Sequence, residues 1–172
     1  NLYVVASDEM QGRDTGSEGQ KKAGRYLIEQ YQKMGVSYPK SMNSYYQTVP
    51  KEALMGRRGN LPESENILAF IEGSEKPEEV LVISAHYDHV GMKNGEIYNG
   101  ADDDGSGTVA LLEIAEAFQM AKKSGKGPKR SILFLHVTGE EHGLLGSKYY
   151  ADNPIFPMAN TVVDLNIDMI GR

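Results

Sequence analysis

The chain has 172 residues, of which 40% are hydrophobic and 24% are charged, a composition typical of a globular domain. Its 24 acidic residues outnumber its 18 Lys and Arg residues and no long basic stripe is present, so we expect no nucleic-acid partner. The absence of cysteine excludes a disulfide framework and a thiolate metal site. The longest apolar runs, such as Val80 to Ile83, fall far short of the ~18 residues that span a bilayer, so we expect no transmembrane segment within these residues.

The beginning of the chain predicts one amphipathic helix over residues 17–34. Ser17 has the position of an N-cap and Gln20 follows three residues later, which is the pattern of a capping box. Gly35 is placed where a helix commonly ends. Between these ends, apolar residues recur at helical spacing: Ala23, Leu27, Tyr31 and Met34.

Strands and helices alternate along the rest of the chain. Apolar runs predict strands at residues 45–49, 66–72, 80–85, 132–137 and 161–167, with a Gly- and Pro-rich loop over 50–64. Helices are predicted after Asp104, on the apolar stripe that includes Leu111 and Ala115, and over residues 143–151. This alternation predicts an α/β fold, with a mostly parallel central sheet flanked by helices, in a single domain over residues 1–172.

Side chains that can bind metal ions follow the predicted strands. His86 and Asp88 follow one buried run, Glu140 and Glu141 follow the next, and Asp168 follows the last. Because ligands bind at the carboxyl ends of parallel strands, we expect these side chains to meet at one edge of the sheet. Each signal alone also fits a core histidine, a helix cap or a solvated turn, but together they predict a cation site.

Three consecutive aspartates, Asp102 to Asp104, precede one predicted helix and could simply cap it, since the helix dipole tolerates acidic residues there. An EF-hand is excluded because its twelfth position would be Leu111, where a carboxylate is required. A phosphate-binding loop is excluded because no Lys follows the glycines. The charges of Asp103, Glu141 and Asp168, together with one hydroxide, would balance two Zn²⁺ ions ~3.5–4 Å apart in a co-catalytic centre.

The chain resembles the M28 family of zinc aminopeptidases and carboxypeptidases. The matching stretches, in chain order, are ASDEMQGR (6–13), HYDHVG (86–91), GADDDGSG (100–107), GEEHGLLGS (139–147) and NIDMIG (166–171). They span almost the whole chain. The resemblance implies a zinc-exopeptidase fold, two Zn²⁺ ions in each complete active site, a peptide substrate and an exported protein, periplasmic or extracellular. It implies most directly an aminopeptidase that cleaves a terminal peptide bond with a metal-bridging hydroxide.

The resemblance also implies a ligand role for four matching residues. His86 and Asp168 would bind one zinc ion. Glu141 would bind the other, and Asp103 would bridge both. Only Asp103 and Glu141 would then hold the second ion within these 172 residues, so we expect that ion to be bound weakly.

Two further residues would act in the reaction. Glu140 would be the general base, and Asp88 would orient His86. Asp102 and Asp104 match no ligand position, and we expect them to be loop and helix-start residues.

The family pattern includes one more ligand, a His downstream of the position of Asp168, and the four residues that follow Asp168 here contain none. We therefore expect a C-terminally truncated fragment of a longer peptidase, inactive or impaired by itself. His89 and His142 are expected to line the pocket, although either could replace the missing ligand. We expect His136, inside a predicted strand, to be a core residue.

Two other functions stay open at this point. Glutaminyl cyclases resemble the family but use a single zinc ion for an intramolecular transfer. Receptor relatives keep the fold without metals and act as binding modules. The complete set of ligands up to Asp168 and the run Asp104-Gly105-Ser106-Gly107 favour the two-metal hydrolase.

Overall fold

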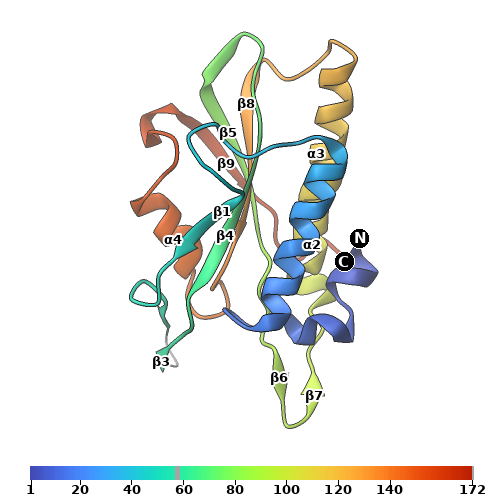
Figure 1. Ribbon diagram of the computed structural model, residues 1–172, viewed down its shortest axis with the longest axis vertical. Helices are drawn as coiled ribbons and strands as arrows, with labels where there is room; N and C mark the ends of the chain where they lie inside the picture. The colour runs from blue at the N-terminus through green and yellow to red at the C-terminus, as the bar shows by residue number, and fades with distance from the viewer. Residues whose placement is uncertain (57–58, 172) are drawn as a thin grey trace.

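The computed structural model describes residues 1–56 and 59–171, and its centre is a five-stranded sheet in the order β1-β4-β8-β5-β9 (Figure 1). The strands are β1 (Tyr46–Val49), β4 (Ser64–Ile71), β5 (Lys76–His86), β8 (Arg130–Val137) and β9 (Thr161–Asn166). β4 pairs antiparallel with both β1 and β8, whereas β5 pairs parallel with both β8 and β9. Only β4 therefore runs against the other four, which confirms the mostly parallel α/β sheet.

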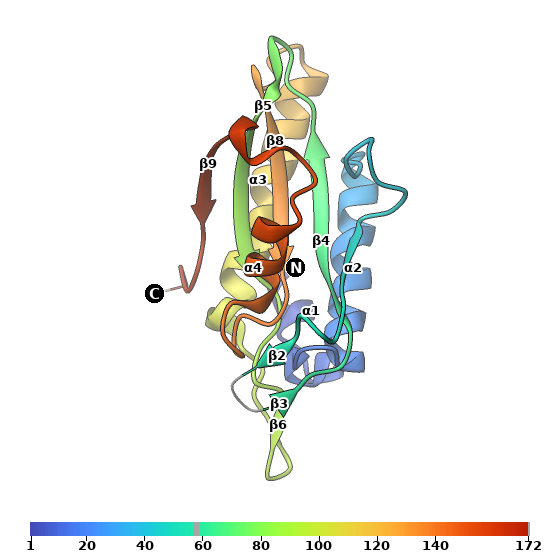
Figure 2. The same cartoon turned by 90° about the vertical axis from the view of Figure 1, so that its left-hand side faces the viewer.

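Helices cover both faces of this sheet. α2 (Glu18–Met34) and α3 (Gly107–Lys123) pack on one face, and α4 (Leu145–Asp152) lies on the other (Figures 1 and 2). The shorter elements are α1 (Leu2–Val5), 3-10 turns at Asp8–Arg13 and Met158–Asn160, an irregular segment at Ala101–Ser106, and the two-residue strands β2 (Met55–Gly56), β3 (Gly59–Asn60), β6 (Met92–Lys93) and β7 (Glu96–Ile97). In the part of the chain that the structure describes, no helix combines the length and the apolarity needed to cross a membrane.

The predicted helix over 17–34 is confirmed as α2, together with both of its ends. The Ser17 hydroxyl accepts a hydrogen bond from the Gln20 backbone N–H at 3.2 Å, and Gly35 has a left-handed φ of 77°. The Gln20 side chain reaches back to the N–H of Gly16 rather than that of Ser17. Its amide also donates to the Thr138 hydroxyl at 2.7 Å, so the start of α2 is fixed beside the end of β8.

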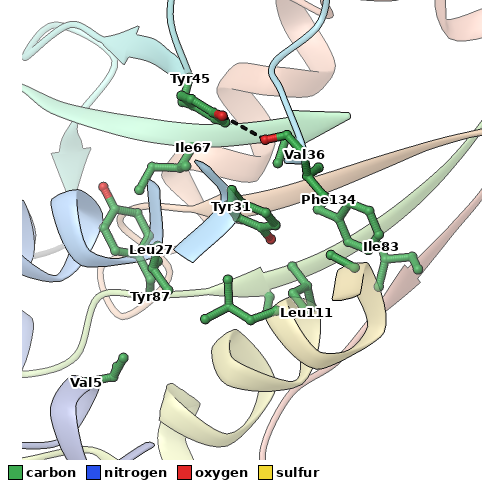
Figure 3. Close-up of a cluster of buried hydrophobic side chains, with 14 of the residues drawn as sticks. Val5, Leu27, Tyr31, Val36, Tyr45, Ile67, Ile83, Tyr87, Leu111 and Phe134 are labelled. Atoms are coloured by element: carbon green, nitrogen blue, oxygen red, sulfur yellow. Dashed lines mark hydrogen bonds between the residues drawn. The ribbon is translucent and has the colours of Figure 1, made fainter. Parts of the chain in front are cut away.

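The main core fills the space between the sheet and the pair α2 and α3, where Leu27, Tyr31, Leu111 and Phe134 are completely buried (Figure 3). A smaller cluster that includes Tyr150 packs under α4. His136 is also completely buried, as predicted, with its Nε2 2.7 Å from the Tyr31 hydroxyl. Burial lowers the pKa of His136 to about 3, so it is neutral and structural at physiological pH.

The strand predicted over 161–167 is confirmed as β9, but its expected burial is wrong. β9 lies at the edge of the sheet and pairs with β5 alone, and Val162, Val163 and Leu165 are exposed. An apolar run does not distinguish a central strand from an edge strand, because both have the same local pattern. The side chain of Asp168 just after β9 is 44% exposed and therefore partly buried.

We predict that Leu111→Ala destabilises the protein by about 2–5 kcal/mol, because it leaves a cavity between α3 and the sheet. Urea unfolding measures this loss. Met120→Ala, on an exposed part of the same helix, is the matched control and should change the free energy of unfolding by no more than about 0.5 kcal/mol. Equal effects of the two substitutions would contradict the packing described here.

Candidate metal centre

Side chains from three strand ends and one loop meet at the carboxyl edge of the sheet. His86 is the last residue of β5, the pair Glu140 and Glu141 follows β8, and Asp168 follows β9. Asp103 comes from the irregular segment that leads into α3. The parallel strands bring these residues together although 82 positions separate His86 from Asp168 in the chain.

The first possible ligand group consists of His86, Asp103 and Asp168, whose ligand atoms all lie within 4.8 Å of one another. The Nε2 atom of His86 is 3.1 Å from Oδ1 of Asp103 and 3.8 Å from Oδ1 of Asp168. Oε2 of Glu140 is also 3.8 Å from this nitrogen, at the border of the group. One imidazole and two carboxylates are a donor set that suits Zn²⁺.

A second group lies beside the first and shares one member with it. It consists of His89, Asp103 and Glu141, again with ligand atoms within 4.8 Å of one another. Nδ1 of His89 is 2.7 Å from Oε1 of Glu141. Asp103 thus lies between the two groups, where a carboxylate could touch two ions.

The imidazole of His86 is buried, and the nearest atom of Asp88 is its backbone carbonyl oxygen rather than its carboxylate. Its Nδ1 is 3.0 Å from the backbone carbonyl oxygen of Asp88, whereas the Asp88 carboxylate is 3.7 Å away. If Nδ1 donates its proton to that carbonyl, Nε2 offers its lone pair to the ligand group. The Asp88 carboxylate instead accepts hydrogen bonds from the Thr15 hydroxyl (2.8 Å) and the backbone N–H of Glu140 (3.2 Å), which holds the Glu140 turn beside the site.

The outer members of the aspartate run, Asp102 and Asp104, bind the backbone that carries Asp168. Oδ1 of Asp104 accepts from the N–H of Met169 at 3.2 Å, and Oδ1 of Asp102 accepts from the N–H of Gly171 at 2.8 Å. The run therefore supplies one possible ligand, Asp103. Its two neighbours, Asp102 and Asp104, hold the loop that carries another possible ligand, Asp168. This is a more specific role than the loop and helix-start positions predicted for them.

Arg13 is a structural residue of the site that the sequence reasoning missed. Its guanidinium is completely buried and donates to the backbone carbonyls of Val5, Tyr87, Asn99 and Gly100 at 2.7–2.9 Å. These bonds tie the N-terminal segment to the loops beside His86 and Asp103. Burial lowers the pKa of Arg13 to about 10, so it still carries its charge at neutral pH. The match over 6–13 was the only signal for it, since an Arg among polar residues normally lies on the surface.

The cluster of carboxylates changes the protonation of its own members. Burial disfavours the charged imidazole of His86, but the neighbouring carboxylates, chiefly Asp88, outweigh this effect and raise its pKa to about 9. Burial raises the pKa of Asp104 to about 7 and raises the pKa of Glu140 and of Glu141. Burial and the neighbouring charges thus favour the protonated forms of these four groups.

The residues fit zinc, the ion that the family resemblance implies. Each group combines one imidazole with two carboxylates, which are ligands of zinc in proteins. Two atoms of the second group, Nδ1 of His89 and Oε1 of Glu141, are buried and take part in no hydrogen bond among the described residues. These two atoms lie 2.7 Å apart and form an ion pair when His89 is protonated, and a bound cation would take the place of that proton.

A cavity of about 350 Å³ opens beside the first group, between the sheet and α4. His86, Glu140 and Asp168 lie along its wall, together with the apolar side chains of Val137 and Tyr150. Two members of the first group, His86 and Asp168, therefore border this cavity.

Comparison with known proteins places the chain in a family and a fold. The sequence profile of peptidase family M28 matches residues 66–172. A probable zinc metalloprotease of Leptosphaeria maculans is 37% identical over 109 residues, which make up 62% of this chain and 24% of that protein. The chain spans only between 11% and 24% of the length of the first curated relatives that it matches.

Solved structures share the fold over almost the whole chain. A Zn-dependent exopeptidase from Parabacteroides distasonis matches 99% of this chain and 61% of its own, with a TM-score of 0.76 and 23% identity. A glutaminyl cyclase from Bacteroides thetaiotaomicron matches the same shares with a TM-score of 0.74 and 21% identity. At these identities the likeness establishes the fold alone, and that fold is the zinc-exopeptidase fold predicted from the sequence.

We predict that zinc binding releases protons at pH 7, because His86 is protonated below a pKa of about 9 and must be neutral to bind zinc. The apparent zinc affinity of the first group should therefore rise as the pH rises toward 9. Calorimetric titration in buffers of different ionisation enthalpy measures the number of protons released. His86→Asn should release about one proton fewer, and zinc binding without any proton release would contradict the assignment.

Proposed function

The chain belongs to peptidase family M28, and on that premise we propose that it carries the catalytic centre of a zinc exopeptidase with two metal ions. The observation that carries the proposal is the position of Asp103, which belongs to both ligand groups. One carboxylate between two donor sets is the arrangement that a co-catalytic pair of ions requires. In this proposal His86 and Asp168 hold one ion and Glu141 holds the other, as the family resemblance implies.

The bound ions would supply Lewis-acid activation of water and of the peptide carbonyl. The chain's own contribution is to hold the ligands rigidly. His86 is fixed by the carbonyl of Asp88, and the Asp168 loop is fixed by Asp102 and Asp104. Such outer partners of ligands typically contribute 10–100-fold to metal affinity or activity.

Glu140 is the proposed general base. Its Oε2 lies 3.8 Å from Nε2 of His86, beside the first ligand group but outside it. Burial raises its pKa, which moves this carboxyl toward the range in which a general base works at neutral pH. Glu140 would accept a proton from the attacking water at this oxygen and then donate it to the leaving amine.

Between the two kinds of exopeptidase, the aminopeptidase is the one that the family resemblance implies most directly. The charge of the ligands does not separate the two, because Asp103, Glu141, Asp168 and one hydroxide would balance two bound Zn²⁺ ions. Arg13 lies near several carboxylates of the site, but it is completely buried and four of its N–H groups donate to backbone carbonyls, so it holds the loops rather than a substrate carboxylate.

A glutaminyl cyclase is the second candidate, because the cyclase from Bacteroides thetaiotaomicron has the same fold. The presence of two ligand groups favours the hydrolase over an enzyme with one zinc ion. Release of the anilide from leucine anilide supports the aminopeptidase, whereas cyclisation of a peptide with an N-terminal Gln supports the cyclase. A protein that binds zinc but does neither would fit a binding module.

We predict that Glu140→Gln in the full-length protein keeps zinc but lowers kcat about 10²–10⁴-fold, the usual contribution of a general acid–base group. Leucine anilide hydrolysis and elemental analysis of the same sample measure both quantities. Glu116→Gln, an exposed substitution on α3, is the control and should leave both unchanged. A Glu140→Gln enzyme with near-normal turnover would remove this residue as the base.

A further inference from the structure

A group of buried, uncharged polar side chains lies behind the turn that carries Glu140 and Glu141. Gln20 of α2, Ser64 of β4 and Thr138, which directly follows β8, are all completely buried. Because they come from three separate parts of the chain, their contact depends on the whole fold rather than on a local pattern. None of the three takes part in the proposed chemistry, although Thr138 stands directly before the turn that carries the proposed base.

The three side chains form a closed ring of hydrogen bonds. The backbone N–H of Gly16 donates to Oε1 of Gln20 at 2.6 Å, which identifies that atom as the oxygen of the amide. The other amide atom, Nε2, therefore donates to the Thr138 hydroxyl at 2.7 Å. That hydroxyl lies 2.7 Å from the Ser64 hydroxyl, which donates to Oε1 of Gln20 at 2.8 Å. When Thr138 donates to Ser64, each hydroxyl both accepts and donates a hydrogen bond, and such complete networks are rigid in a protein interior.

The backbone of Thr138 is held as firmly as its side chain. Its N–H donates to Oδ1 of Asn66 at 3.0 Å, and its carbonyl accepts from the N–H of Gly146 in α4 at 2.8 Å. The Asn66 amide donates in turn to the carbonyl of Gly146 at 2.9 Å. A Cβ atom at Gly146 would clash with both Thr138 and Asn66, so only glycine lets α4 approach this closely. Thr138 is therefore tied to α2, β4 and α4 at once.

We propose that this ring makes Thr138 a positioning residue for the Glu140 turn. The turn begins directly after Thr138, and its middle is held by the Asp88 carboxylate, which accepts from the N–H of Glu140. With both places fixed, the Glu140 carboxyl is kept beside His86. A displacement of about 1 Å in such a position can lower a rate about 10²-fold. This assignment rests on the proposed role of Glu140 as the base and adds the residues that place it.

The test compares Thr138→Val with Ser131→Ala in the full-length protein, at saturating zinc and with leucine anilide as the substrate. Valine keeps the shape of threonine but removes the hydroxyl from the ring. Ser131 is the matched control because it is also completely buried, at the opposite end of β8, where its hydroxyl donates to the carbonyl of Pro77 and accepts from the N–H of Gly73. We expect Thr138→Val to lower kcat about 10–100-fold with KM nearly unchanged, and Ser131→Ala to change neither.

A double substitution separates the positioning of the base from a general loss of structure. If Thr138 acts through Glu140, Thr138→Val should cost little further kcat once Glu140→Gln has removed the base, because residues that act as a unit are not additive. Thr138→Ser keeps the hydroxyl and should regain most of the wild-type kcat. Wild-type kcat in Thr138→Val, or an equal loss in the presence and absence of Glu140, would overturn the assignment.

Hydrogen exchange of the metal-free protein gives a readout that needs no activity. We expect Thr138→Val to speed the exchange of the backbone N–H groups over residues 138–146, whereas Ser131→Ala leaves them at the wild-type rate. Unchanged exchange over these residues in Thr138→Val would contradict the role of the ring. Ser64→Ala removes a different member of the ring and carries the same measurements if Thr138→Val does not fold.

The wild-type enzyme distinguishes the two proposals. A wild type that releases the anilide, together with a Thr138→Val variant of equal kcat, would overturn the role of Thr138 and leave the peptidase intact. A zinc-loaded wild type that does not hydrolyse leucine anilide would overturn the proposed function and the role of Thr138 with it.

Discussion

Repulsion among carboxylates is the constraint on which the rest of this site depends. Six of them gather at one edge of the sheet: Asp88, Asp103, Asp104, Glu140, Glu141 and Asp168. The two that are fully buried are stabilised by hydrogen-bond donors, Asp88 by Thr15 and the Glu140 N–H, Asp104 by the N–H groups of Gly107 and Met169. Arg13 lies near several of these carboxylates, but the four hydrogen bonds that its guanidinium donates go to backbone carbonyls. The negative charge of this cluster is the physical basis of the proposed cation site.

The fold and the location of the site could be predicted because their signals are local. The capping pattern at Ser17 and the glycine at 35 fix α2, and the apolar runs fix the central strands within a few residues. Once the strands are parallel, the residues that follow them must meet at one edge. This is why His86, Glu140 and Asp168 could be placed together from the sequence alone.

The rest depends on contacts between distant segments, which leave no local pattern. Nothing in the polar sequence around Arg13 indicates that its guanidinium is buried and holds four carbonyls. The three consecutive aspartates contact different groups because their side chains point in different directions from an irregular segment. Asp102 and Asp104 bind the backbone beyond Asp168, whereas Asp103 points toward His86. The exposure of β9 follows from its place at the sheet edge, and only the folded chain shows that the ring of His89 lies beside Glu141 whereas that of His142 lies beside Asp14.

These features together make Asp103 the centre of the site, with a histidine and a carboxylate on either side of it. Anomalous diffraction at the zinc edge, from crystals of the zinc-loaded protein, tests this most directly. The account predicts two zinc ions ~3.5–4 Å apart, both bound by Asp103. A single ion, or two ions of which neither touches Asp103, would contradict it.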